Sequence, residues 1–163
     1  MFESKDILDL LGLNGAQADA SGQVDEFSQE EIFEEKLREA MDLAGQKSAQ
    51  GRTMALESMC TAFLKKFIPD FVEDRRMTFT DIIERALKKG KNAEQIAAAR
   101  LAVLLCIQLG SEDVMKDLKS VLITLMMDPA APMKTRAAVA SALGDCTFLV
   151  SQVIFTRIQI LKH

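Results

Sequence analysis

Apolar residues along this chain recur three and four positions apart, a spacing that places side chains on one face of a helix. From residue 27 onward, start and stop signals divide the pattern into six predicted helices, over about 28–44, 48–68, 78–89, 92–109, 112–127 and from 132 onward. The start signals are Ser28 with Glu31, Ser48, Thr78 with Asp81, Asn92 with Gln95, and Pro132 in a first turn, and the stop signals are Gly45, Pro69, Gly90, Gly110 and Pro129.

The predicted helices repeat when the chain is shifted by 42 residues. In the first helix of each pair, the matching sets are Leu37, Phe79, Val121 and Met41, Ile83, Leu125. In the second helix they are Leu56, Ala98, Ala140; Met59, Leu101, Leu143; Cys60, Ala102, Gly144; and Leu64, Cys106, Phe148. A helix-pair period of about 40–47 residues is typical of HEAT and armadillo arrays, in which neighbouring pairs complete each other's core. The sequence predicts an all-α, armadillo/HEAT-like α-solenoid of about three helix-pair repeats over residues 27–150.

Two flanking segments differ from this repeat domain. Residues 1–26 form an acidic and largely flexible leader, because the small polar stretch 14–24 has no packing periodicity. An apolar cluster in the leader predicts a short helix at 4–13, with a docking peptide or an export signal as alternatives. Residues 151–163 form an apolar tail, which is expected to be a sticky end.

Composition argues against most enzyme classes. The chain has no Trp or Tyr, and its one histidine is the last residue, His163. A terminal histidine is a poor anchor for a Ser-His-Asp or Cys-His site, and two-His or three-His metal sites are excluded. The chain lacks a CxxC pair and a GxxxxGK[ST] loop, and we predict a protein that is not an enzyme, with no metal, cofactor or small-molecule substrate. The pairs Glu30-Glu31 and Glu34-Glu35 suit a helix start, which favours acids.

The cysteines and the N-terminus bear on location. Cys60, Cys106 and Cys146 fall in predicted second helices among Ala and Leu, so we interpret them as small buried hydrophobes rather than reactive thiols. An odd number of cysteines without a signal peptide favours a reducing, intracellular location. No apolar run reaches the roughly 18 residues of a membrane span, so no membrane association is expected.

Charge is unevenly distributed, and it supplies the candidate site. Residues 1–50 carry 12 acids and 4 bases, whereas residues 51–163 carry 12 acids and 16 bases. Six bases gather within 17 residues: Arg75, Arg76, Arg85, Lys88, Lys89 and Lys91. A solvated helix end explains Arg85, Lys88 and Lys89, since cations offset the helix dipole there. The alternative is a contact with nucleic-acid phosphates or an acidic protein, which would also use the three bases on predicted loops.

Two segments carry a family resemblance. Residues 74–91, DRRMTFTDIIERALKKGK, resemble the signature of the interferon-related developmental regulator family, and residues 104–110, LLCIQLG, resemble its next block. The similarity runs with gaps from about Lys36 to Leu149. It implies an armadillo-like fold and a nuclear or cytoplasmic transcriptional co-regulator in differentiation, with ribosome binding and translational control as further family properties.

The chain also departs from the family pattern. The loop after Gly110 is shorter than is typical, and the tail from Ser151 does not resemble the family's continuation. Members are longer, so the expectation is an N-terminal piece, a splice product or a truncated gene model that lacks a capping repeat.

Two functional hypotheses follow. The first is a non-enzymatic scaffold that binds transcriptional regulator proteins. The alternative is a ribosome- or RNA-associated translational regulator, in which the six bases contact RNA.

Overall fold

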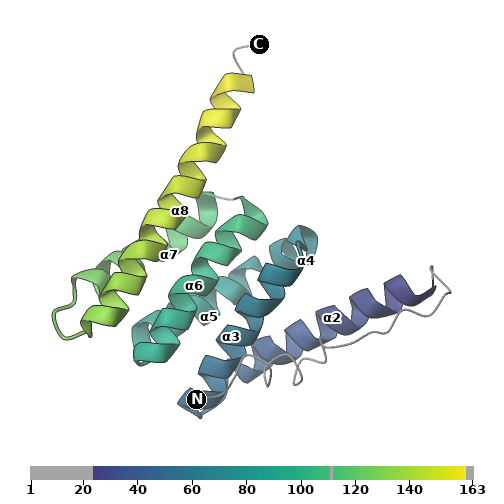
Figure 1. Ribbon diagram of the computed structural model, residues 1–163, viewed down its shortest axis with the longest axis horizontal. Coiled ribbons are helices and arrows are strands. Elements are labelled where there is room, and N and C mark those ends of the chain that lie inside the picture. The colour runs from purple at the N-terminus through teal and green to yellow at the C-terminus, as the bar shows by residue number, and fades with distance from the viewer. Residues whose placement is uncertain (1–23, 111, 161–163) are drawn as a thin grey trace.

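The computed structural model describes residues 24–110 and 112–160, which contain seven α-helices and no strand (Figure 1). The helices are α2 (Val24–Leu43), α3 (Ala49–Lys65), α4 (Pro69–Asp74), α5 (Arg76–Lys89), α6 (Asn92–Leu109), α7 (Glu112–Met127) and α8 (Met133–Ile160). The predicted helix at 4–13 lies outside the described residues. Residues 24–26, placed in the leader by the sequence, belong to α2, and α8 runs on through residue 150 into the segment assigned to the tail.

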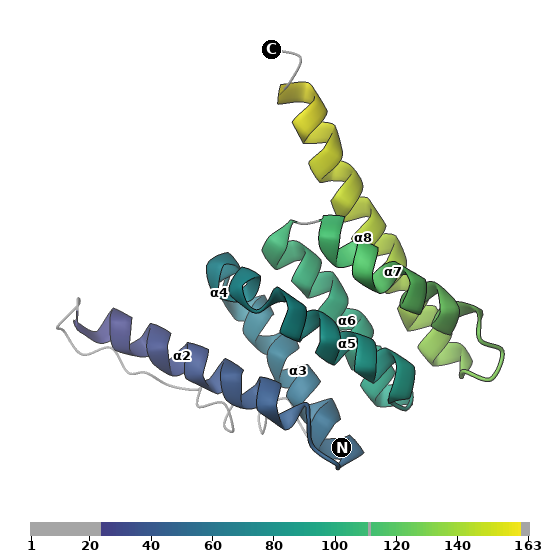
Figure 2. The same ribbon diagram turned by 180° about the vertical axis from the view of Figure 1, so that it is seen from behind.

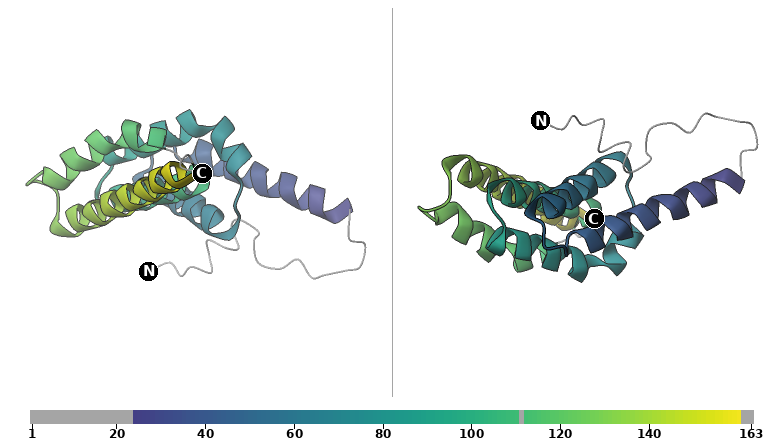
Figure 3. Two further views of the ribbon diagram at one scale, coloured as in Figure 1. Left: turned by 90° about the horizontal axis from the view of Figure 1, so that it is seen from above. Right: turned by 90° about the horizontal axis from the view of Figure 1, so that it is seen from below.

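The helices form two layers. Helices α3, α6 and α8 lie side by side in one layer, with α3 packed on α6 and α6 on α8 (Figure 1). The other layer holds α2, α5 and α7, as the reverse view shows (Figure 2). Each helix of this layer packs on its partner in the other layer, so that α2 pairs with α3, α5 with α6 and α7 with α8. The views from above and below show the two layers edge-on (Figure 3).

The buried positions follow the predicted repeat in the first two pairs. Leu37 and Phe79 are buried in α2 and α5, and Val121 is buried in α7. In the second helices, Leu56 and Met59 of α3 are buried, as are their partners Ala98 and Leu101 of α6. The core therefore lies between the layers, as the periodicity predicted.

The prediction fails by one residue in α8. Ala140, Leu143, Gly144 and Phe148 were expected to face the core; Leu143 is half-buried against it, but the other three are exposed. In the part of α8 whose burial is described, the buried apolar residues are instead Val139, Ala142 and Cys146, each 41 residues after a buried residue of α6. Helix α8 begins 41 residues after α6, one residue fewer than the 42-residue shift requires. Because one residue corresponds to a rotation of about 100° around a helix, the face of α8 that meets the core is turned by that angle from the predicted face. Leu64 of α3 is also exposed, since its neighbour Phe63 occupies the core.

Helix ends confirm some local signals. Ser48 caps α3, its hydroxyl accepting a hydrogen bond from the Gly51 N–H at 3.3 Å. Gly110 ends α6 with φ of 57°, a left-handed conformation that glycine adopts without strain. The predicted bounds 112–127 are those of α7.

Other start signals were misplaced. Helix α2 begins at Val24, so Ser28 lies inside it, and α5 begins at Arg76, before Thr78. The Phe79 N–H donates to Arg75 O, which extends α5 toward the α4 junction. Gln95 donates its side-chain N–H to Leu87 O of α5, so a tertiary contact takes the place of the expected capping box. The short helix α4, with Phe71 and Val72 buried, was not predicted because six residues are too few for a periodic signal.

Gly90 is required by space rather than by its backbone angles. A Cβ at this position would overlap Ala86 O and would lie 2.9 Å from the Cγ and Cδ atoms of Glu94. We expect Gly90→Ala to lower the free energy of unfolding by about 2 kcal/mol, a typical overpacking cost, measured by urea denaturation. Gly144→Ala is the matched control, because nothing lies within 4 Å of its added Cβ, and it should be neutral or stabilising by up to about 1 kcal/mol. Equal effects of the two substitutions would contradict the steric explanation.

Candidate functional site

The six predicted basic residues lie in two groups. Arg75 and Arg76 lie at the junction of α4 and α5, whereas the other four lie at the far end of α5 and just beyond it. Helix α5 has 14 residues and is therefore about 20 Å long, which separates the groups by most of that length. The six residues do not form one compact patch.

The first group is engaged within the fold. The Arg75 guanidinium lies 4.0 Å from the centroid of the Phe71 ring and donates to Phe71 O. Arg76 lies 3.8 Å from a Glu73 carboxylate oxygen and 3.7 Å from one of Asp117, on α7. These contacts join α4, α5 and α7 and give both arginines a structural role.

The second group is only partly engaged. Arg85 donates to Ala44 O at 2.9 Å, which fastens α5 to the chain just after α2, and Lys88 pairs with Glu84 on its own helix. The side chains of Lys89 and Lys91 are exposed and make no hydrogen bond or ion pair with the residues that the structure describes. The cations available to a partner are therefore concentrated beyond the C-terminal turn of α5.

An ion pair not predicted from the sequence lies beside this second group. The guanidinium of Arg52, on α3, donates to both carboxylate oxygens of Glu94, on α6, at 2.7 and 3.0 Å. The remaining guanidinium nitrogen of Arg52, Nη1, donates to the backbone carbonyls of Gln46 and Lys47, which follow α2 in the chain. The hydrogen bond with Glu94 raises the pKa of Arg52 against the opposing effect of burial. The two residues are 42 positions apart, so the repeat shift could have suggested this pairing.

This ion pair forms part of the wall of a small cavity of about 260 Å³, lined by Gly45, Gln46, Arg52, Arg85, Lys89 and Glu94. Three cations line it against one carboxylate, and that carboxylate is fully bonded to Arg52. The cavity therefore carries a net positive charge.

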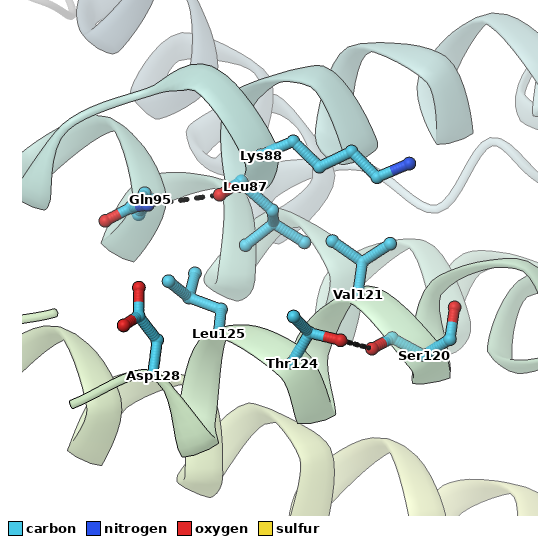
Figure 4. Close-up of a pocket in the computed structure, with 8 residues that line it drawn as sticks. All are labelled: Leu87, Lys88, Gln95, Ser120, Val121, Thr124, Leu125 and Asp128. Carbon is cyan, nitrogen blue, oxygen red and sulfur yellow. Dashed lines mark hydrogen bonds between the residues drawn. The ribbon is translucent and has the colours of Figure 1, made fainter. Parts of the chain in front are cut away.

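A larger cavity of about 360 Å³ lies between α5, α6 and α7 (Figure 4). Its lining residues are Leu87, Lys88, Gln95, Ser120, Val121, Thr124, Leu125 and Asp128. Only Lys88 among them belonged to the predicted site. The periodicity could not reveal this cavity, because its walls come from three helices that the sequence does not place relative to one another.

The three cysteines are buried, as predicted. Burial raises the pKa of the Cys60 thiol to about 12, and its Sγ lies 3.7 Å from Ala97 O. A hydrogen bond with Cys106, together with burial, raises the pKa of Cys146 above its ordinary value. The thiols of Cys60 and Cys146, held protonated in this way, are poor nucleophiles and poor metal ligands, whereas the same hydrogen bond lowers the pKa of Cys106.

Other kinds of site are absent from the described part of the chain. Within residues 24–110 and 112–160, no group of three or more Asp, Glu, His or Cys side chains is placed to hold a metal ion. In the same residues, no helix has the length and apolar character needed to cross a membrane.

Three large apolar side chains are exposed on the layer formed by α3, α6 and α8. Leu64 of α3, Ile107 of α6 and Phe148 of α8 are 66%, 48% and 62% exposed. Each lies fifteen residues after the first residue of its helix, so the three stand at similar heights on neighbouring helices. We call these three residues the apolar row. Clustered apolar side chains on a surface mark sites of interaction with other proteins more often than isolated ones do.

Comparison with known proteins identifies relatives. The family model described as interferon-related developmental regulator matches residues 12–154 of this chain. Interferon-related developmental regulator 1 of Homo sapiens is 44% identical over 135 residues, which cover 80% of this chain and 30% of the human protein. The Sus scrofa protein of that name is 42% identical over 147 residues, covering 86% and 33%. Interferon-related developmental regulator 2 of Mus musculus is 42% identical over 125 residues, covering 74% and 28%.

The chain thus spans about a third of the length of these relatives. The matched region includes both segments whose resemblance was seen in the sequence, 74–91 and 104–110. It also extends beyond the 36–149 range of that resemblance at both ends. The chain belongs to the interferon-related developmental regulator family.

Proposed function

We propose that this chain is a non-enzymatic protein-interaction scaffold, built as an armadillo/HEAT-like array of three helix pairs. The pairing of α2 with α3, α5 with α6 and α7 with α8 supports this arrangement, as do the buried positions that recur after 42 and then 41 residues. In such arrays each pair contributes a helix to a continuous surface suited to partner proteins.

The apolar row carries the proposal. Leu64, Ile107 and Phe148 expose large apolar side chains, whereas their chain neighbours Phe63 and Cys106 are buried. Removing such side chains from water on binding contributes about 25 cal/mol for each Å² of apolar area that is covered. A partner with a complementary apolar surface would therefore gain affinity from all three helices at once.

The relatives are named developmental regulators, which supports partners among proteins that control gene expression. We propose that the chain acts as a transcriptional co-regulator through these partners, with a nuclear or cytoplasmic location. It acts by recruitment and needs no cofactor or small-molecule substrate.

A second function is favoured by a different observation. The side chains of Lys89 and Lys91 are exposed and unpaired within the described chain, and Lys89 also lines the positive cavity together with Arg52 and Arg85. Unpaired cations attract RNA phosphates through counterion release. A ribosome- or RNA-associated translational regulator would use this end of α5 rather than the apolar row.

One experiment separates the two functions. The chain is fused to a DNA-binding domain and tethered at a reporter promoter, and ribosome co-sedimentation is measured in parallel. We expect the wild-type chain to alter reporter transcription and the double variant Ile107→Glu, Phe148→Glu to lose most of the effect. A charge buried at a central contact typically costs about 2 kcal/mol of binding, or about 30-fold in affinity.

The double variant Lys89→Glu, Lys91→Glu is the matched control, because it also changes two exposed residues. It should keep its effect on the reporter. A full effect in the Ile107/Phe148 variant would contradict the scaffold proposal. Loss of ribosome co-sedimentation in the lysine variant alone, with its usual dependence on salt, would instead support the translational function.

A further inference from the structure

We propose that the cavity between α5, α6 and α7 binds an arginine or lysine side chain of a partner protein. The inference deepens the scaffold function proposed above and rests on it, since it names a chemical feature of the partner. The cavity lies in the α5 and α7 part of the molecule, whereas the apolar row lies on α3, α6 and α8. The two surfaces can therefore be tested separately.

The floor of the cavity is apolar. Leu87 of α5 and Val121 and Leu125 of α7 all belong to the buried core, and their side chains meet where the two helices pack together (Figure 4). The volume of about 360 Å³ falls within the range of about 300–1,000 Å³ that is usual for ligand sites. A floor of this kind accepts the methylene stem of a long side chain.

One end of the cavity presents hydrogen-bond acceptors. Gln95 of α6 donates its amide N–H to Leu87 O at 3.1 Å, and this bond fixes the amide nitrogen on that side and leaves the oxygen as an acceptor. Asp128, just after α7, accepts from the Ala130 N–H through Oδ1 at 2.8 Å and forms no ion pair with the described residues. Figure 4 shows the Asp128 carboxylate and the Gln95 amide at the same end of the cavity.

The nearby charges favour a cation at that end. The carbonyl end of α7 carries partial negative charge, and its last turn contains no basic residue. Arg136 of α8 donates to one of these carbonyls, Met126 O, at 2.9 Å, and among the described residues neither Arg136 nor another cation forms an ion pair with Asp128. The lining residue Lys88 pairs with Glu84, and its ammonium points away from Asp128 in Figure 4.

These features select a class of ligand. An anion is disfavoured by Asp128, and a purely apolar side chain would take the acceptors of Asp128 and Gln95 out of water without replacing their hydrogen bonds. Arginine and lysine combine an apolar stem with a cationic head and so match both the floor and the end of the cavity. A charge-assisted hydrogen bond to Asp128 would be the strongest single contact.

The probe is Nα-acetyl-arginine methylamide, titrated into the full ¹⁵N-labelled chain and followed by chemical shifts of backbone amides. The neutral isostere Nα-acetyl-citrulline methylamide is the control ligand. We expect saturable shifts at Leu87, Gln95, Val121, Thr124 and Asp128 with the arginine probe and not with the citrulline probe. Asp128→Asn should weaken binding by about fivefold or more, because it removes the charge while keeping an oxygen for the Ala130 N–H.

Asp145→Asn is the matched control variant, since it removes an exposed carboxylate from α8, outside the cavity lining. It should bind the arginine probe as the wild type does. Equal binding of arginine and citrulline, unchanged affinity in Asp128→Asn, or shifts confined to other residues would each overturn the inference. None of these results would bear on the reporter effect of the apolar row, so failure of the cavity and failure of the scaffold function remain distinguishable.

Discussion

Replacing Phe79 by alanine is expected to lower the free energy of unfolding by about 4 kcal/mol, as large-to-small changes of fully buried aromatic residues do. Phe79 is 0% exposed, lies on α5, and its ring centroid is 5.2 Å from that of Phe63 on α3, with the planes tilted by 60°. The substitution removes the ring from the contact between two helix pairs and leaves a cavity there. Urea denaturation followed by far-UV circular dichroism would measure the loss.

Met77→Ala is the control for this experiment. Met77 lies on the same helix, two residues away, but its side chain is 59% exposed. We expect a change within about 0.5 kcal/mol, as is usual for surface positions. Similar losses for the two variants would contradict the place that the structure gives Phe79 in the core.

Replacing Gln108 by leucine should cost about 3 kcal/mol, although leucine has a similar size. Gln108 is a buried polar residue of α6 that is 3% exposed. Its Oε1 accepts from the Ile68 N–H at 2.9 Å, and its Nε2 donates to Phe63 O at 3.1 Å and to Lys66 O at 2.9 Å. The substitution leaves one N–H and two carbonyl groups without this partner, and an unsatisfied buried group costs about 1–3 kcal/mol.

The affected backbone is the connection between α3 and α4, so the substitution should also loosen this segment. Hydrogen exchange of the Ile68 amide is the direct measurement, and it should accelerate in Gln108→Leu beyond what the global loss of stability accounts for. Gln50→Leu, at an exposed position in the first turn of α3, is the control and should change stability by less than about 0.5 kcal/mol. Unchanged stability in Gln108→Leu would show that its three hydrogen bonds contribute nothing net.

Local chemistry explains which features could be predicted. Ser48 and Gly110 mark helix ends because each satisfies backbone groups of its own helix, so the signal lies within a few residues. Leu37 and Leu101 were recognisable as core residues because a buried face repeats with the helical period. The all-helical class follows from such local signals, and the family follows from the resemblance of residues 74–91 and 104–110. Both predictions are confirmed.

The candidate site was harder to predict. Arg75 and Lys89 belong to one cluster in the sequence, yet the 14 residues of α5 separate the two groups of bases. In addition, the Arg75 guanidinium is packed on the Phe71 ring. A count of charges along the chain takes no account of the distance between two basic residues, nor of the contacts that a basic side chain makes within the fold. Gln108 shows the same limit, since a polar residue near the end of an apolar helix gives no sign of which distant backbone groups it will bond.

The sequence by itself determined six of the seven described helices, the inner faces of the first two helix pairs and the family, because these depend on residues a few positions apart or on direct similarity. Only the tertiary structure decided that α8 faces the core through Val139, Ala142 and Cys146, since a change of one residue in the repeat turns a helix by about 100°. It also decided the pairing of Arg52 with Glu94 and the cavity that ends at Asp128. These features join atoms from separate helices, and their positions are fixed only when the layers pack.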